Sequence, residues 1–366
     1  MTGAGIRESR YGVDRAALAE VLAGEPRYRV DQVWRGLYEQ LATPAEMTNL
    51  PRALRERLSE ALPEALDGVT ESVSDRGDTV KFLWSLSGDA RVETVLMLYP
   101  DRATVCVSSQ AGCAMGCGFC ATGQAGFTRH LATGEIVEQV VRAARRARDG
   151  GRRVSNVVFM GMGEPLANEA AVWGAVERLH GDLGLSARHL TISTVGIVPG
   201  IRRLAERRLP VTLAVSLHAA NDALRNELVP INRRYDLDNL LGACADFLAV
   251  SGRRISFEWA LIDGVNDRPS DAVELAALCR RLRPSAHVNL IPLNPTPGWP
   301  TRGTPPARVA EFRDRLHSLG VNATVRRNRG TDIDAACGQL AAATPRTTEP
   351  VGVGLSSPRR ARTGTG

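Results

Sequence analysis

The stretch from Cys106 to Gly123, CVSSQAGCAMGCGFCATG, holds four of the seven cysteines of this 366-residue chain. Cys113, Cys117 and Cys120 are spaced C-x3-C-x2-C, and Cys106 stands seven residues before the first of them. Thiolates are soft ligands that bind zinc, copper(I) or iron–sulfur clusters. The glycines between and after the cysteines allow a backbone to turn tightly around a bulky group. The stretch therefore predicts a metal or cluster loop.

The cysteine spacing favours a cluster over zinc. Structural zinc sites use four ligands, commonly as two pairs separated by about a dozen residues or more. Three cysteines this close together fit a [4Fe–4S] cluster with one iron left open. An open iron can bind a cofactor through its amino and carboxylate groups. Cys106 offers a fourth thiolate, so a four-cysteine zinc protein that only binds RNA stays an alternative at this point.

The composition indicates a globular protein, with 43% hydrophobic residues and a net charge of +6. No apolar run reaches the roughly 20 residues of a membrane span, and the N-terminus lacks the apolar core of a secretion signal. We expect a cytoplasmic monomer without a membrane partner. An odd number of cysteines then indicates ligands or redox-active thiols rather than a disulfide framework. The positive charge is a mild indication of a polyanionic partner.

The elements that must position the cysteines alternate in type. From Ala103 to Asn294, short apolar segments typical of strands alternate with amphipathic helical segments, and one more strand follows. This alternation predicts an α/β protein with a parallel sheet. No dinucleotide-binding GxGxxG follows the first strand, so a full or partial (β/α) barrel is favoured over a doubly wound sheet.

The chain divides into four predicted parts. Residues 1–68 form a small helical accessory domain, which either binds RNA phosphates or only packs on the core. Residues 69–102 form a β-rich linker that contains two strand-like segments, TVKFLWSL and VETVLMLY. Residues 103–340 form the core, and the Thr-, Pro-, Gly- and Arg-rich residues 341–366 form a disordered basic tail.

Polar residues cluster at the ends of the predicted parallel strands. In a β/α barrel these carboxyl ends form one face, and that face carries the active site. The cysteine loop follows the first strand, so the same rim would hold it. The residues at the later strand ends are Gly163 and Glu164, then Ser193, then Ser216, Leu217 and His218, and finally Asn294.

These motifs together resemble a known family. The cysteine triplet with Phe119 before its last member, and GEP after the second strand, resemble the radical S-adenosylmethionine (SAM) superfamily. Longer motifs resemble the rRNA and tRNA adenine methyltransferases of the RlmN/Cfr family, over a match from about Arg10 to Leu340. They are CVSSQAGCAMGCGFCATG, GMGEPLAN, STVGIVPGI, SLHAANDALRNELVPIN, LIPLNP and RGTDIDAACGQL.

The resemblance implies a radical SAM core and an RNA methyltransferase that uses two SAM molecules per turnover. The family methylates an adenine of 23S rRNA, and its C2-directed branch also methylates the adenine beside the anticodon of tRNAs. An electron donor such as flavodoxin or ferredoxin is a further implied partner. Overall likeness favours the C2 branch, while the motifs leave the C8-directed branch as an alternative.

The resemblance also implies ligand sets. One [4Fe–4S] cluster per chain would be bound by Cys113, Cys117 and Cys120. The SAM site would be formed by Gly163, Glu164, Ser193, Ser216, Leu217, His218 and Asn294.

Three further roles follow from the resemblance. Cys337 would be methylated to S-methylcysteine and then joined to the RNA, and Glu93 would accept the proton from the base. Cys106 would release the product by forming a transient disulfide with Cys337. Without the resemblance, Cys106 has the sequence environment of an ordinary core cysteine between two valines. Cys244 and Cys279 lie on amphipathic helical segments, and we predict that they only pack in the core.

Overall fold

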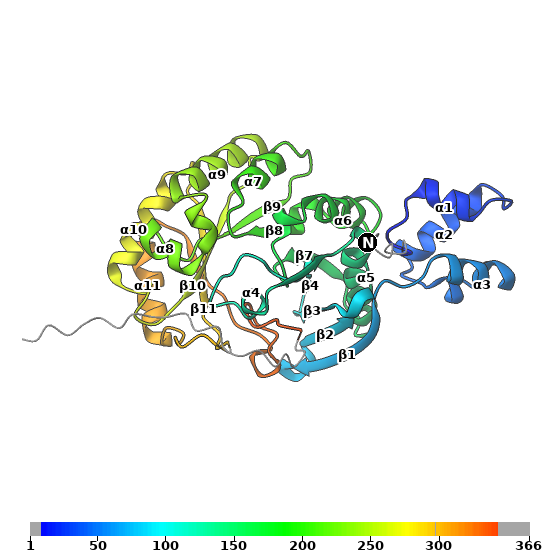
Figure 1. Cartoon of the computed structure of the whole chain (residues 1–366), viewed down its shortest axis with the longest axis horizontal. Coiled ribbons are helices and arrows are strands. Elements are labelled where there is room, and N and C mark those ends of the chain that lie inside the picture. The colour runs from blue at the N-terminus through cyan, green and yellow to red at the C-terminus, as the bar shows by residue number, and fades with distance from the viewer. Residues whose placement is uncertain (1–8, 297, 343–366) are drawn as a thin grey trace, which may run out of the picture.

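The computed structural model describes residues 9–296 and 298–342. Its centre is a ten-stranded sheet in the order β1-β2-β3-β4-β7-β8-β9-β10-β11-β12. Figure 1 shows the sheet curving, with helices along its outer side. The strand order has two free ends, β1 and β12, so the barrel is open. The predicted α/β fold, a partial (β/α) barrel of the radical SAM type, is confirmed.

Within the ten-stranded sheet, the strands in the order β4-β7-β8-β9-β10-β11-β12 run parallel to one another, as the alternation predicted. Both faces of such strands are covered, which explains the nearly continuous apolar runs. In β10, for example, five of six residues are buried. The parallel strands are β4 (Ala103–Cys106), β7 (Val154–Phe159), β8 (Leu190–Thr194), β9 (Thr212–Ser216), β10 (Ser256–Leu261), β11 (His287–Pro292) and β12 (Ala323–Val325).

Amphipathic helices connect these strands and cover the outer face of the sheet (Figure 1). They are α5 (Thr133–Asp149), α6 (Glu169–Gly181), α7 (Val198–Ala205), α8 (Asp222–Leu228), α9 (Leu237–Ser251), α10 (Pro269–Arg280) and α11 (Pro306–Ser318). Cys244 on α9 and Cys279 on α10 are fully buried in the main hydrophobic core, which confirms their packing role.

The two strand-like segments of the predicted linker extend the core sheet. β2 (Thr79–Ser85) pairs with β1 (Asp67–Ser74) and with β3 (Arg91–Leu98), and β3 pairs with β4, all antiparallel. Val95 of β3 lies opposite Cys106 of β4. This edge of the sheet therefore stands directly beside the strand that leads into the cysteine loop.

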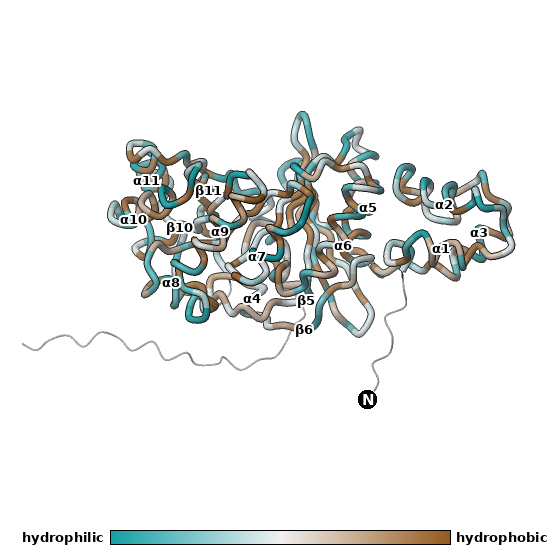
Figure 2. Tube along the Cα trace, turned by 90° about the horizontal axis from the view of Figure 1, so that it is seen from above, coloured by the Kyte–Doolittle hydropathy of each residue, from teal (hydrophilic) through white to brown (hydrophobic). Residues whose placement is uncertain are grey.

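Three helices precede the sheet, α1 (Arg15–Val21), α2 (Tyr28–Tyr38) and α3 (Arg52–Ala61). Figures 1 and 2 both show them as a lobe beside α5 and α6. Polar contacts join the two parts: Trp34 Nε1 donates to Asp182 at 2.9 Å, and Arg145 pairs with Glu46 at 2.6 Å. Many arginines of this region are thus engaged in internal ion pairs.

The cysteine loop has a small framework that the sequence did not predict. β5 (Gln110–Gly112) and β6 (Phe127–His130) form a separate two-stranded sheet, and α4 (Ala121–Ala125) follows the loop. Gly112 has φ +76°, and a Cβ there would lie 1.9 Å from the carbonyl oxygen of Gly126. Only glycine allows this approach, because an L side chain is strained at that φ and would overlap the facing strand.

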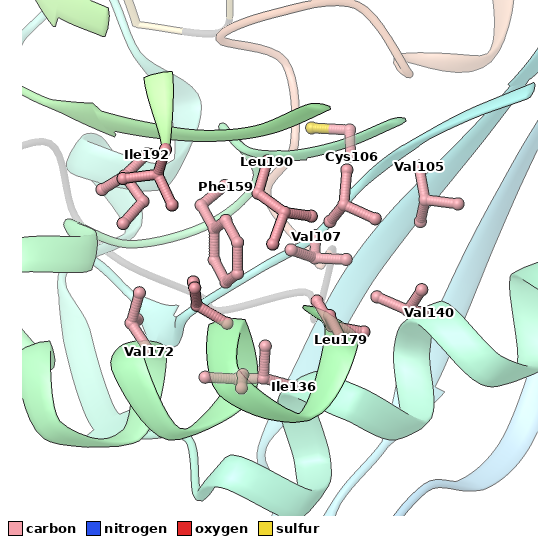
Figure 3. Close-up of a cluster of buried hydrophobic side chains, with 14 of the residues drawn as sticks. Val105, Cys106, Val107, Ile136, Val140, Phe159, Val172, Leu179, Leu190 and Ile192 are labelled. Carbon is pink, nitrogen blue, oxygen red and sulfur yellow. The ribbon is translucent and has the colours of Figure 1, made fainter. Parts of the chain in front are cut away.

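The main core lies between the parallel sheet and the helices. Figure 3 shows Val105 and Val107 pointing toward α5 and α6, while Cys106 between them points the opposite way. Successive strand residues face opposite sides of a sheet. Cys106 therefore belongs to the other face, away from the helix layer.

No helix of the described residues has the length and apolar content needed to cross a membrane.

The predicted disordered tail falls almost wholly outside the described part of the chain, which ends at Ala342.

Candidate active site

A cavity of about 1000 Å³, including its open mouth, lies at the carboxyl ends of the parallel strands. This is the face on which β/α barrels carry their active sites. The cavity brings the three triplet cysteines together with most of the strand-end residues predicted from the sequence. Its wall includes Cys113, Cys117, Cys120, Gly163, Glu164, Ser193, Ser216, His218, Glu258, Arg326 and Cys337.

The three triplet thiols fit an iron–sulfur cluster better than a single ion. Burial raises the pKa of Cys113 to about 11, and burial also raises the pKa of Cys117. Thiolates at these positions need a positive group beside them, and cluster iron supplies one. Across residues 9–296 and 298–342, no three His, Cys, Asp or Glu side chains converge to hold one metal ion. Cys106 does not line this cavity, so the four-cysteine zinc alternative lacks its fourth ligand.

The cysteine loop is packed tightly against a distant segment. A Cβ on Gly118 would lie 2.3 Å from the ring of Trp299, and a Cβ on Gly123 would lie 2.8 Å from the carbonyl oxygen of Cys117. Both positions therefore need glycine for lack of space. Trp299 packs on this loop.

Glu164 is one of the carboxylates of the cavity wall and is buried. Its Oε1 accepts a hydrogen bond from Leu166 N at 3.0 Å, and its Oε2 accepts one from Val195 N at 2.9 Å. Burial raises its pKa to about 7, against the effect of these donors. A cationic group entering the cavity would favour the ionised carboxylate. Glu164 is therefore suited to bind the ammonium group of an amino acid or of SAM.

His218 lies at the end of β9 in the left-handed region, with φ +59°. Its Nδ1 accepts a hydrogen bond from Ala260 N at 3.0 Å, and its ring meets the Phe119 ring edge-on with 4.9 Å between centroids. Burial lowers its pKa to about 3. The side chain is thus a neutral, fixed part of the wall rather than an acid or a metal ligand.

Two of the predicted SAM residues do not line the cavity. Leu217 is fully buried beneath it, and its amide donates to the carbonyl oxygen of Glu258 at 3.0 Å. Asn294 is also buried, and its Nδ2 donates to the carbonyl oxygen of Cys337 at 3.1 Å. In this structure Asn294 therefore holds the segment that carries Cys337.

A second cavity, of about 990 Å³ with its mouth, lies beside the first. Cys106 and Cys337 both line it, and Cys337 lines the first cavity as well. Met160 and Arg326 are the other residues shared by both walls. Cys337 thus stands between the triplet cysteines on one side and Cys106 on the other.

Glu93 is buried on β3 and lines neither cavity. Its Oε1 pairs with Lys81 Nζ at 2.9 Å, and its Oε2 accepts a hydrogen bond from Ala341 N at 3.0 Å. It lies on the same face of β3 as Val95 and Met97, which do line the second cavity.

The sequence reasoning missed two buried charged residues near the site. Arg225 is fully buried, and its guanidinium donates to the carbonyl oxygens of Val195 at 2.7 Å and Leu217 at 3.1 Å. It thereby fixes the loops that follow β8 and β9. Its place inside the motif SLHAANDALRNELVPIN was the available signal. Glu258 of β10 lines the first cavity, and its sequence neighbourhood, SFEWAL, looks like plain core.

The chain is similar to known radical SAM proteins along most of its length. A profile of the radical SAM superfamily matches residues 107–276. A protein from Chloroflexus aurantiacus, named probable dual-specificity RNA methyltransferase RlmN, is 51% identical over 345 residues, covering 90% of this chain and 92% of that protein. A protein of the same name from Frankia casuarinae is 56% identical over 336 residues, covering 88% and 79%.

A solved structure agrees with these relatives. The crystal structure of a radical SAM methyltransferase from Sphaerobacter thermophilus matches with a TM-score of 0.88 at 51% identity, covering 92% of this chain and 99% of that chain. The resemblance inferred from the motifs is confirmed: the chain belongs to the RlmN family of radical SAM RNA methyltransferases.

Proposed function

We propose that this protein methylates C2 of a specific adenine in 23S rRNA and of the adenine beside the anticodon in tRNAs, through S-methylation of Cys337 and with two SAM molecules per turnover. The main support for this proposal is the position of Cys337, which lines two neighbouring cavities. The triplet thiols and most of the proposed SAM residues line one cavity, and Cys106 lines the other. In this reaction Cys337 receives a methyl group from SAM and passes it to RNA, so its side chain must be reachable from both cavities.

The chemistry of the target explains why a cluster is needed. C2 of adenine is an electron-poor carbon, so it cannot displace a methyl group from SAM as a nucleophile. When bound by Cys113, Cys117 and Cys120, the cluster supplies the electron that turns SAM into a source of carbon-centred radicals. The side chains of the protein bind and orient SAM and RNA, and they hold or accept protons.

Binding of SAM falls to the wall of the first cavity. Glu164 would hold the ammonium group, and Ser193 and Ser216 offer hydroxyl groups from the ends of β8 and β9. Gly163 has φ +102°, and a Cβ there would lie 2.6 Å from Gln110 Cβ, so the backbone turns closely at this point. Leu217, His218 and Asn294 complete the set by fixing this wall and the Cys337 segment.

Two further groups of the chain complete the reaction. Glu93 would accept the proton that leaves C2, and reaching the base requires its contacts with the backbone of residues 341 and 342 to open. Cys106 would then attack the sulfur of Cys337. That attack breaks the bond between the Cys337 sulfur and the carbon joined to the base. The electron pair of this bond stays on the carbon, which takes up a proton and leaves as the methyl group of the RNA, while Cys106 and Cys337 form a disulfide. An external thiol must reduce the disulfide before the next turnover.

The remaining assignments complete the proposal. The helical part within residues 1–68 would be an accessory RNA-binding domain, residues 69–102 a β-rich connection, residues 103–340 the core and residues 341–366 a basic tail. The enzyme would act as a cytoplasmic monomer that receives electrons from flavodoxin or ferredoxin.

The position of the methyl group is the decisive test. The anaerobically reconstituted protein is incubated with reduced flavodoxin or a chemical reductant, a 23S rRNA fragment, tRNA and SAM carrying a CD3 group, and the digested nucleosides are analysed by mass spectrometry. We expect labelled 2-methyladenosine from both RNAs and none from Cys337→Ala. A labelled 8-methyladenosine product would assign the chain to the C8 branch and overturn the proposal.

A further inference from the structure

The chain has 46 lysines and arginines in total. Lys81 is its only lysine, and all the others are arginines. A chain with so strong a preference for arginine keeps lysine at one position. That lysine pairs with Glu93, the proposed proton acceptor, with 2.9 Å between Nζ and Oε1. The two side chains are 14% and 5% exposed, so the pair is largely shielded from water and salt.

The sheet register explains how the pair forms. Lys81 of β2 lies opposite Val95 of β3, and Val95 lies opposite Cys106 of β4. Residues directly opposite each other point to the same face, so these three form a row across the sheet. Glu93 lies two residues before Val95 on that face, and the long lysine side chain reaches it diagonally. The ammonium group of Lys81 therefore lies on the same face of the sheet as Cys106.

The same ammonium group also contacts the segment that carries Cys337. Lys81 Nζ donates to the carbonyl oxygen of Asp334 at 3.4 Å, and Asp334 is in the left-handed region with φ +52°. The second carboxylate oxygen of Glu93 accepts from Ala341 N at 3.0 Å. Lys81 thus contacts this segment before Cys337, at Asp334, and Glu93 contacts it after Cys337, at Ala341.

Lysine and arginine bind a carboxylate in different ways. An ammonium group is a compact charge that can bind one oxygen of a carboxylate, whereas a guanidinium tends to bind both oxygens side by side. Here the contact of Lys81 Nζ is with Oε1, whereas Oε2 accepts hydrogen bonds from the backbone amides of Ala341 and Ala342. Oε2 is the oxygen that becomes available when that segment moves.

We propose that Lys81 is a positioning residue for Glu93: its ammonium group binds Oε1, orients the carboxylate and leaves Oε2 to accept the proton. The inference rests on the proposed role of Glu93. It adds a specific requirement for lysine at residue 81, which arginine does not meet because it would occupy both oxygens.

The pair itself can be observed without any activity. Labelling with 13C,15N-lysine places the label at a single site in this chain, so NMR reports Lys81 alone. We expect Glu93→Gln to shift the Lys81 side-chain signals, and Glu71→Gln to leave them in place. Glu71 is the matched control, because its ion pair with Arg146 lies on the exposed edge strand β1. Unchanged Lys81 signals in Glu93→Gln would overturn the inference.

The function of the pair is tested in a single turnover with Lys81→Met, Lys81→Arg and the control Arg202→Met, which removes one partner of an exposed ion pair with Asp246. Mass spectrometry follows methylation of Cys337, and gel electrophoresis follows RNA joined to the protein. We expect both Lys81 variants to methylate Cys337 within about twofold of wild type. Released methylated RNA should fall at least about tenfold, since a general base contributes about 10²–10⁴-fold, and joined RNA should persist.

The outcomes separate the two proposals. If wild type itself never methylates Cys337, the proposed function fails, while the NMR result on the pair still stands. If wild type completes the turnover and Lys81→Arg releases product at the wild-type rate, the lysine requirement is overturned. Loss of Cys337 methylation in both Lys81 variants would show a role in folding or SAM binding and would also overturn it.

Discussion

Cys106 and Cys337 line the same cavity, although one ends β4 and the other lies in the last described segment of the chain. Both are free thiols in this structure. Burial raises the pKa of Cys106 to about 12, and the neighbouring Cys337 adds to the effect. Cys106 is therefore a protonated thiol at neutral pH, which protects it from side reactions until a sulfur atom is presented to it.

Replacement of Cys106 by alanine should trap the protein on its substrate. Cys106→Ala removes the thiol proposed to attack Cys337, so RNA joined through Cys337 should accumulate under anaerobic turnover. Denaturing gels and mass spectrometry of the Cys337 peptide measure the adduct. Cys244→Ala, which removes a thiol buried in the core on α9, should release product normally. Normal release from Cys106→Ala would mean that its role is misassigned.

Cluster binding should depend on the triplet cysteines alone. Cys117→Ala removes one of the three triplet thiols on the wall of the first cavity, so reconstituted protein should lose most of its iron and its visible absorption. Cys279→Ala changes a cysteine that is equally buried but lies on α10, and should keep both. Iron and sulfide analysis measures the result. Full iron content in Cys117→Ala would contradict the ligand assignment.

The contact between Gly118 and Trp299 should be visible in a double mutant. Gly118→Ala places a methyl group 2.3 Å from the indole ring, so the cysteine loop or the tryptophan must move. Overpacking of this kind costs about 1–3 kcal/mol. We expect weaker cluster retention in Gly118→Ala and recovery in Gly118→Ala/Trp299→Ala, measured as iron lost during dialysis. If the second substitution restores nothing, the two residues are not coupled.

His218 should make the cofactor-free protein sensitive to acid. The unfolded chain takes up a proton on this side chain near pH 6.5, but the folded chain does so only near pH 3, because burial opposes the charge. The stability that His218 contributes is complete above pH 6.5 and is lost as the pH falls. At pH 5 the loss is about 2 kcal/mol.

His218→Asn is the matching variant, because asparagine tolerates φ +59° and offers an oxygen to Ala260 N. Its free energy of unfolding, from urea titrations at pH 5 and pH 7, should change less with pH than that of wild type. An equal change in both proteins would contradict the buried, neutral state of His218.

Much of the site could be read from the sequence because its motifs are local. The triplet Cys113, Cys117 and Cys120 and the strand-end residues Glu164 and Ser193 are recognised by spacing and by the alternation of strands and helices. Parallel strands place their carboxyl ends at one rim, so alternation alone predicts that such residues meet. The structure brings these five together on one cavity wall.

Other relationships depend on contacts between distant segments. No local pattern indicates that Lys81 reaches Glu93, that Arg225 ties together the loops after β8 and β9, or that Trp299 packs on Gly118. These contacts follow from strand register and from the path of long loops, which periodicity in one segment does not encode.

The sequence by itself therefore determined the family, the barrel and the polar residues that meet at one rim, because these follow from short motifs and from hydrophobic periodicity. Only the tertiary structure decided that Cys106 faces away from the helix layer, that Asn294 holds the Cys337 segment, and that Cys337 stands between two cavities. The physical reason is that the face of a strand and the partners of a loop are fixed by packing against segments far away in the chain.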